Sequence, residues 1–143
     1  MKIILTCALL SVSALLLNSC KKYEGEGGKS SITGKIMIEE KLYVNGLYSS
    51  TVSYNGATED VYIVYGEGKT TPDNKEECGF DGSFEFNYLQ PGKYTIYAYN
   101  EIFHAGASVT NNDDDYYTNE VVSTTIELKK KEDLDLGTIT LIR

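Results

Sequence analysis

Alternation of apolar and polar residues with a period of two constrains the fold of this chain more than any other feature of its sequence. Ile32, Ile36 and Ile38 recur at even positions, with Lys35 and Met37 between them, as in a strand with one buried face. No window of about 12 residues beyond the N-terminal segment holds a 3.6-residue period, although a typical helix needs that length. The sequence therefore predicts strands rather than helices.

The same pattern continues along the chain and is broken by turn-forming residues. Further predicted strands cover Val61–Tyr65, Ser83–Leu89, Lys93–Asn100, Val121–Leu128 and Leu134–Ile142. An Asn45-Gly46 pair between β-forming residues predicts a hairpin, because Asn-Gly adopts the positive φ angles of a tight turn. The lysine run before Asp133 is typical of a solvated turn that protects a sheet edge. Seven or eight short strands in residues 32–143 predict an all-β fold, a Greek-key β-sandwich.

The first 20 residues have a different composition. A predominantly apolar run of 15 residues extends from Ile3 to Leu17, which is too short to cross a bilayer and suits the hydrophobic region of a signal peptide. The run ends in Leu17-Asn18-Ser19-Cys20, which resembles the lipobox of bacterial lipoproteins. The resemblance implies a signal peptide at residues 1–19 and a lipid-modified Cys20 that anchors the chain to a membrane. An ordinary secretory leader, with Cys20 incidental, is the alternative.

The residues after Cys20 are rich in glycine, serine and charge. Such a composition predicts a flexible tether over residues 20–31, followed by one folded domain over residues 32–143. Lys21, rather than aspartate, follows the cysteine, which is similar to lipoproteins of the outer membrane. The resemblance leaves open whether the domain faces the periplasm or the cell surface.

Net charge excludes one class of partner. The whole chain carries a formal charge of −8, and Lys2 is the sole charged residue before Cys20, so 12 basic and 21 acidic residues follow and give −9. Such a surface lacks the cations that neutralise phosphates, so we expect no nucleic-acid partner. Cys78 is the one cysteine of the predicted domain, which excludes an internal disulfide. We expect a buried small residue there, with a reactive thiol as the alternative.

A motif in residues 79–98 is the most informative part of the predicted domain. Its elements are Asp81-Gly82, Phe84, Phe86, Leu89, Pro91-Gly92, Tyr94 and Ile96. They resemble the pattern of carboxypeptidase regulatory-like and collagen-binding B-type domains, which implies a prealbumin-like (transthyretin-like) sandwich. The segment between Tyr43 and Glu59 is longer than in that family, so the Asn45-Gly46 hairpin is expected as an insertion. The fold hosts unrelated activities and does not define a function.

Residues that could perform catalysis are scarce. His104, expected at the surface in a loop, and Arg143 are the single histidine and arginine, whereas transthyretin-like hydrolases carry several of each. No nucleophile motif or cysteine–histidine pairing occurs, so we expect no enzyme, no cofactor and no metal. Collagen-binding B-type domains often carry a lysine–asparagine isopeptide bond. Here Lys35 points away from the predicted core and no asparagine stands in Leu134–Ile142, so we expect none.

Two segments could instead bind a ligand. Asn111–Asp115 offers the oxygen ligands that calcium prefers but lacks EF-hand spacing, so a solvated loop is the main interpretation and calcium the alternative. Tyr62, Tyr97, Tyr99, Tyr116 and Tyr117 could form an exposed platform for a sugar or peptide.

Three functions follow from these observations. The first is a non-catalytic lipoprotein of the cell envelope, a scaffold for protein–protein contacts or complex assembly. The second is a surface lipoprotein that binds glycans through a tyrosine-lined face, and the third is an enzyme with an unfamiliar site. A tyrosine-lined groove would favour the second, and a deep polar pocket the third.

Overall fold

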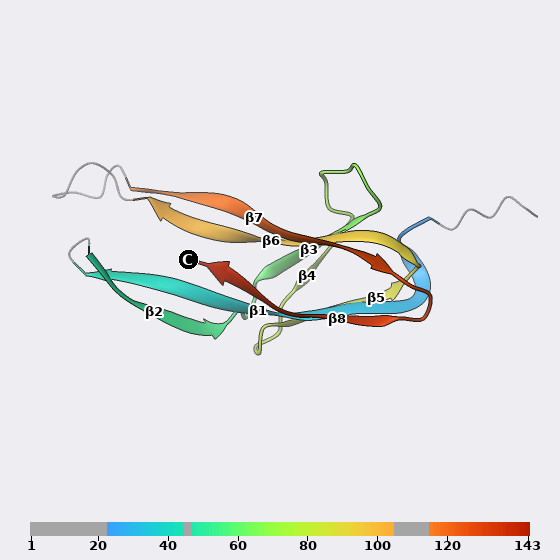
Figure 1. The fold of residues 1–143 in the computed structure, drawn as a ribbon, viewed down its shortest axis with the longest axis horizontal. Helices are drawn as coiled ribbons and strands as arrows, with labels where there is room; N and C mark the ends of the chain where they lie inside the picture. Colours follow the sequence, from blue (N-terminus) through green and yellow to red (C-terminus); the bar gives the residue numbers. More distant parts are fainter. Residues whose placement is uncertain (1–22, 45–46, 105–114) are drawn as a thin grey trace, which may run out of the picture.

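The structure is a computed structural model that describes residues 23–44, 47–104 and 115–143. Its eight strands are β1 (Glu26–Val44), β2 (Leu47–Asn55), β3 (Asp60–Tyr65), β4 (Asn74–Glu77), β5 (Ser83–Leu89), β6 (Gly92–His104), β7 (Tyr116–Leu128) and β8 (Asp133–Ile142). They form two facing sheets (Figure 1), which confirms the predicted all-β sandwich of seven or eight strands. The predicted signal peptide at 1–19, Cys20, Asn45-Gly46 and Asn111–Asp114 lie outside the described residues.

The first sheet is built around the long strand β1. β8 pairs with one edge of β1 in parallel. β5 and β2 pair antiparallel with the opposite edge, β5 along the first part of β1 and β2 along the second. Ile32 is therefore flanked by β5 and β8, whereas Ile38 is flanked by β2 and β8. Val44 at the end of β1 pairs with Leu47 at the start of β2, so the strands on either side of residues 45–46 form the predicted hairpin.

The second sheet has the order β4-β3-β6-β7. The inner faces of the two sheets bury Ile32, Ile36, Ile38, Val61, Ile63, Phe84, Phe86, Leu89, Tyr94, Ile96, Ala98, Leu128 and Leu141. These residues occupy the alternating positions that the sequence predicts to be apolar, and each large side chain contributes roughly 1.5–3 kcal/mol through burial. The core therefore lies between β1, β5 and β8 on one side and β3 and β6 on the other.

Two hairpins extend beyond this core at one end of the molecule (Figure 1). One consists of the second part of β1 with β2, and the other of the far ends of β6 and β7. We call them the first arm (residues 39–44 and 47–55) and the second arm (residues 99–104 and 116–121). All nine residues of β2 are exposed. The C-terminus of β8 lies between the arms.

The opposite end of the molecule contains the start of β1 and the turns β5–β6 and β7–β8 (Figure 1). The folded domain begins earlier than the sequence predicts, because β1 starts at Glu26 rather than near Ile32. Ser30 and Ser31 are buried. The Ser30 hydroxyl donates to the Lys129 carbonyl at 2.8 Å, and the Ser31 hydroxyl donates to Asp133 at 2.8 Å. The composition of this segment suggested a flexible tether, but its two buried serine hydroxyls form hydrogen bonds with partners distant in the sequence.

Two further elements differ from the sequence prediction. β4 is a short polar edge strand that pairs with β3 and was not among the predicted strands. β6 continues past Asn100 because β7 pairs with it to its end, so His104 closes a strand rather than occupying a loop.

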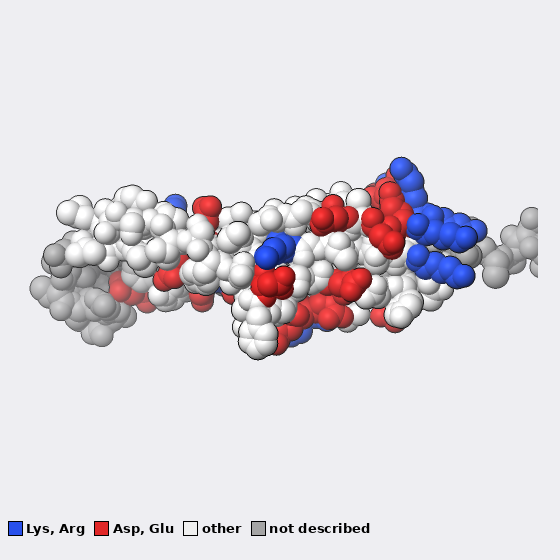
Figure 2. All heavy atoms as spheres, turned by 90° about the horizontal axis from the view of Figure 1, so that it is seen from below, with Lys and Arg blue, Asp and Glu red and all other residues white. Residues whose placement is uncertain are grey.

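Charge is unevenly distributed over this fold. Figure 2 shows acidic side chains spread along the molecule, whereas blue lysine atoms gather at the end opposite the arms.

Candidate functional site

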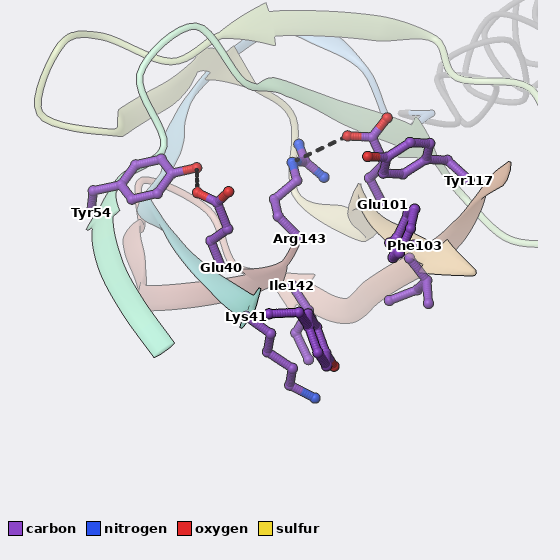
Figure 3. Close-up of a pocket in the computed structure, with 10 residues that line it drawn as sticks. Glu40, Lys41, Tyr54, Glu101, Phe103, Tyr117, Ile142 and Arg143 are labelled. Atoms are coloured by element: carbon purple, nitrogen blue, oxygen red, sulfur yellow. Dashed lines mark hydrogen bonds and ion pairs between the residues drawn. The ribbon is translucent and has the colours of Figure 1, made fainter. Parts of the chain in front are cut away.

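A cleft of about 530 Å³ lies between the two arms. Its lining residues are Glu40, Lys41, Tyr43, Tyr54, Glu101, Ile102, Phe103, Tyr117, Ile142 and Arg143. The first arm and the second arm each supply one wall, and the C-terminal residues of the chain lie between them (Figure 3). The volume falls in the range of small-molecule sites. The cleft is therefore the main candidate for ligand binding.

Aromatic rings form the apolar part of the lining. Phe103 and Tyr117 are cross-strand partners, with ring centroids 5.3 Å apart and planes inclined at 54°. Phe103 is 41 % exposed and Tyr117 is 62 % exposed. Tyr43 and Tyr54 on the first arm are also exposed. Rings with this much free surface can stack on a flat apolar ligand face.

Arg143 organises the charged part of the lining. Its Nη2 lies 2.5 Å from Glu59 Oε2, and its Nε lies 3.9 Å from Glu101 Oε2. Nη1 donates to the Tyr99 carbonyl at 3.1 Å. The backbone of Arg143 also bonds to β1, donating to the Glu39 carbonyl at 3.0 Å. These contacts fix the guanidinium and join the end of the chain to both arms.

Two carboxylates face the cleft with hydrogen-bonding capacity left. The Tyr54 hydroxyl donates to Glu40 Oε2 at 3.2 Å. Partial desolvation of the hydroxyl and its hydrogen bond to Glu40 raise the pKa of Tyr54, so the hydroxyl stays a donor at neutral pH. A carboxylate accepts several hydrogen bonds, so Glu40 and Glu101 can each accept more from a ligand.

The predicted tyrosine platform is not assembled as the sequence suggests. Tyr62 and Tyr97 stack on each other with centroids 5.0 Å apart, and Tyr99 packs edge-on against both. Tyr97 is 8 % exposed as a result. Tyr116 stacks on His104 at 4.6 Å, which leaves Tyr117 as the member of the predicted set that lines the cleft.

Two tyrosines that the sequence reasoning did not select, Tyr43 and Tyr54, also line the cleft. The position of Tyr43, two residues before the predicted Asn45-Gly46 turn, was the available signal for the first of them.

The remaining candidate residues lie apart from the cleft. His104 Nε2 lies 2.8 Å from Thr118 Oγ1. The Lys35 amine lies 3.8 Å from Asp81 at the surface, pointing away from the core as predicted. Cys78 is buried, as predicted, and burial together with nearby acidic groups, Glu59 the first of them, raises the pKa of its thiol to about 11.

Among residues 23–44, 47–104 and 115–143, no group of three or more His, Cys, Asp or Glu could hold a metal ion. In the same ranges no helix has the length and apolar character that crossing a membrane requires. The predicted calcium loop, apart from Asp115, lies outside the described residues.

Comparisons with known proteins identify a structural neighbour but no family. No known protein family matches the sequence, and no curated protein is significantly similar to it. One similar solved structure is a Pseudomonas aeruginosa protein described as a candidate carbohydrate-binding protein. It is 11 % identical, with a TM-score of 0.47, over 84 % of this chain and 92 % of that chain. A similarity of this degree does not indicate a shared function.

Proposed function

We propose that this chain is a lipid-anchored, non-catalytic binding protein of the bacterial outer membrane, and that the cleft between its arms binds a saccharide. The observation that carries the proposal is the lining of the cleft, where exposed aromatic rings stand beside two carboxylates and a fixed guanidinium. Sugars present both features that such a lining recognises, apolar C–H faces and dense hydroxyl groups. The membrane attachment rests on the lipobox that ends at Cys20.

The aromatic and the charged parts of the cleft lining have different roles in this proposal. Phe103 and Tyr117 provide the surface on which a sugar ring stacks, as one pre-formed cross-strand pair. Glu40 and Glu101 accept hydrogen bonds from sugar hydroxyls, and Arg143 holds Glu101 in place. A binding rather than a catalytic role is supported by the guanidinium of Arg143, which is held by Glu59, Glu101 and the Tyr99 carbonyl.

A glycan array probed with the detergent-solubilised chain tests the proposal. We expect the variants Tyr117→Ala and Glu101→Gln to bind the recognised glycan roughly three- to tenfold more weakly. The first removes a stacking ring, and the second replaces a charged acceptor oxygen with an amide donor. Tyr88→Ala is the matched control, since Tyr88 is exposed on β5, outside the cleft. Retention of full affinity by both cleft variants would exclude the cleft as the saccharide site.

A second candidate function, protein–protein contact, is favoured by the outer edge of β2. This strand has a partner on one edge and contains neither a charged residue nor a proline in Leu47–Asn55. Natural proteins usually protect such an edge with charge or proline, so an extended segment of another protein could add to it as a further strand.

A photo-crosslinker placed in the cell at Ser50 on β2 or at Ser123 on β7 tests this second function. We expect a specific adduct from Ser50 that the substitution Val52→Lys abolishes, and no adduct from Ser123. Equal adducts from both positions would exclude the β2 edge as a specific site of protein–protein contact.

A further inference from the structure

The cationic side chains of the described residues fall into two groups. Those in ion pairs are Lys35, Lys69, Lys75, Lys93 and Arg143. Those without an ion pair inside the described ranges are Lys29, Lys41, Lys129, Lys130 and Lys131. Lys41 lines the cleft, and the other four lie together at the opposite end of the molecule. We call these four residues the lysine end.

Backbone and side-chain contacts hold the lysine end together. The Ser30 hydroxyl, next to Lys29 in the chain, donates to the carbonyl of Lys129 at 2.8 Å and accepts from the Glu132 N–H at 3.2 Å. A recess of about 290 Å³ lies beside the β5–β6 turn, with Lys29, Lys130 and Lys131 in its lining. Figure 2 shows the resulting concentration of positive charge on a molecule that is otherwise mostly acidic.

The chain also reaches Cys20 from this end. Gly25 is fixed there, because its N–H donates to the buried Tyr94 hydroxyl at 3.0 Å and its carbonyl accepts from the Gln90 N–H at 2.7 Å. Five residue steps separate Gly25 from Cys20, and a fully extended chain spans at most about 18 Å over that number. A lipid on Cys20 would therefore keep Gly25, at this end of the molecule, within about 18 Å of the membrane.

We propose that the lysine end docks on the phosphate headgroups of anionic phospholipids in the leaflet that holds the anchor. The inference rests on the lipid anchor of the proposed function. Repulsion keeps the acidic body away from an anionic surface, whereas the unpaired lysines attract it, each by about fivefold in binding at low salt. The domain then stands upright on the membrane.

The upright orientation determines where the saccharide cleft lies. β6 runs from Gly92 at the lysine end to Glu101 in the cleft, a distance of about 30 Å at the usual rise of a strand. The arms and their cleft therefore point away from the bilayer that carries the anchor.

Acylation of lysines in vesicles tests this docking. The lipidated protein is purified from membranes, reconstituted in phosphatidylcholine vesicles with or without about 30 % phosphatidylglycerol, acetylated briefly and analysed by mass spectrometry. We expect the phosphatidylglycerol to slow acetylation of the lysine end at least about threefold, and about 0.5 M salt to remove this protection. Lys35 and Lys75 on the body serve as internal controls and should react equally in both vesicles.

Charge-neutralised variants provide the matched comparison. K129Q/K130Q/K131Q should remove the protection of Lys29, whereas K35Q/K69Q/K75Q, with the same change in charge, should leave it intact. Equal acetylation in both vesicles, or a Cys20 peptide without lipid, would overturn the proposal. Protection by vesicles containing lipid A but not by phosphatidylglycerol would overturn the assignment to phospholipid. Tyr117→Ala should keep the lysine protection, so failure of saccharide binding is distinguishable from failure of docking.

Discussion

Replacing Tyr94 by phenylalanine tests the hydrogen bonds that hold the start of β1 in the sandwich. Tyr94 is 0 % exposed, and its hydroxyl donates to the Gln90 carbonyl at 2.6 Å. The same oxygen accepts from the N–H of Gly25, itself buried, at 3.0 Å. Phenylalanine keeps the buried ring and removes both hydrogen bonds, so the variant isolates their contribution.

The expected loss of stability follows from the buried backbone N–H of Gly25, which loses its hydrogen-bond acceptor in the variant. A buried donor without a partner costs about 1–3 kcal/mol, and in Tyr94→Phe the N–H of Gly25 is such a donor. We therefore expect the free energy of unfolding to fall by about 2 kcal/mol. For a domain of this size, such a loss lowers Tm by about 6–10 °C.

Urea unfolding monitored by circular dichroism measures this change. Tyr88→Phe is the matched control, because Tyr88 is 74 % exposed and its hydroxyl makes no hydrogen bond among the described residues. Hydrogen exchange should also show faster exchange of the amides near Gly25 in Tyr94→Phe. If the two variants unfold within about 0.5 kcal/mol of each other, the start of β1 is not held by Tyr94 and the flexible tether predicted from the sequence is correct there.

Three further substitutions test other parts of the account. Gly82→Ala should lower the free energy of unfolding by more than about 2 kcal/mol in urea, since φ is 82° and a Cβ would lie 2.3 Å from the Ile36 carbonyl oxygen; wild-type stability would contradict the close approach. Burial raises the pKa of the Cys78 thiol from 9.0 to about 11 in the folded state. The thiol therefore contributes to the free energy of unfolding below pH 9, and this contribution is lost as the pH rises through 11. Between pH 9 and 11, Cys78→Ala should lose roughly 2–3 kcal/mol less stability than the wild type. An unchanged dependence of stability on pH would refute the raised pKa of this thiol. Arg143→Gln should lower the free energy of unfolding by about 1–2 kcal/mol, because it leaves the half-buried Glu59 carboxylate unpaired. A double-mutant cycle with Glu59→Gln should show that the two side chains are energetically coupled. Strictly additive effects of the two substitutions would contradict the ion pair.

The core strands were predictable because burial in a two-layer sandwich repeats every second residue. Phe84 and Phe86 on β5, and Tyr94 and Ile96 on β6, are buried at the alternating positions that the sequence indicates. The start of β1 was not predictable in this way, because Ser30 is held by the backbone of a turn 99 residues away. The composition of the residues around Ser30 does not predict a hydrogen-bond partner so distant in the sequence.

The cleft was harder to predict than the core because it depends on three distant parts of the chain. Glu40, Glu101 and Arg143 meet where two hairpins and the C-terminus converge. The sequence singled out Tyr97 as an exposed ring, but its stacking on Tyr62 buries it. An aromatic residue on a strand can pack against its neighbours as readily as it can face solvent, and alternation alone does not separate the two outcomes.

Mapping a bound saccharide by NMR locates its binding site on the protein. The isotope-labelled protein is titrated with the glycan that binds most strongly on the array. We expect the backbone amide shifts to change at Glu40, Tyr43, Glu101, Phe103 and Tyr117, the residues that line the cleft on the two arms. Shifts confined to other surfaces, or no shift at saturating glycan, would contradict the assignment of the cleft between the arms as the binding site.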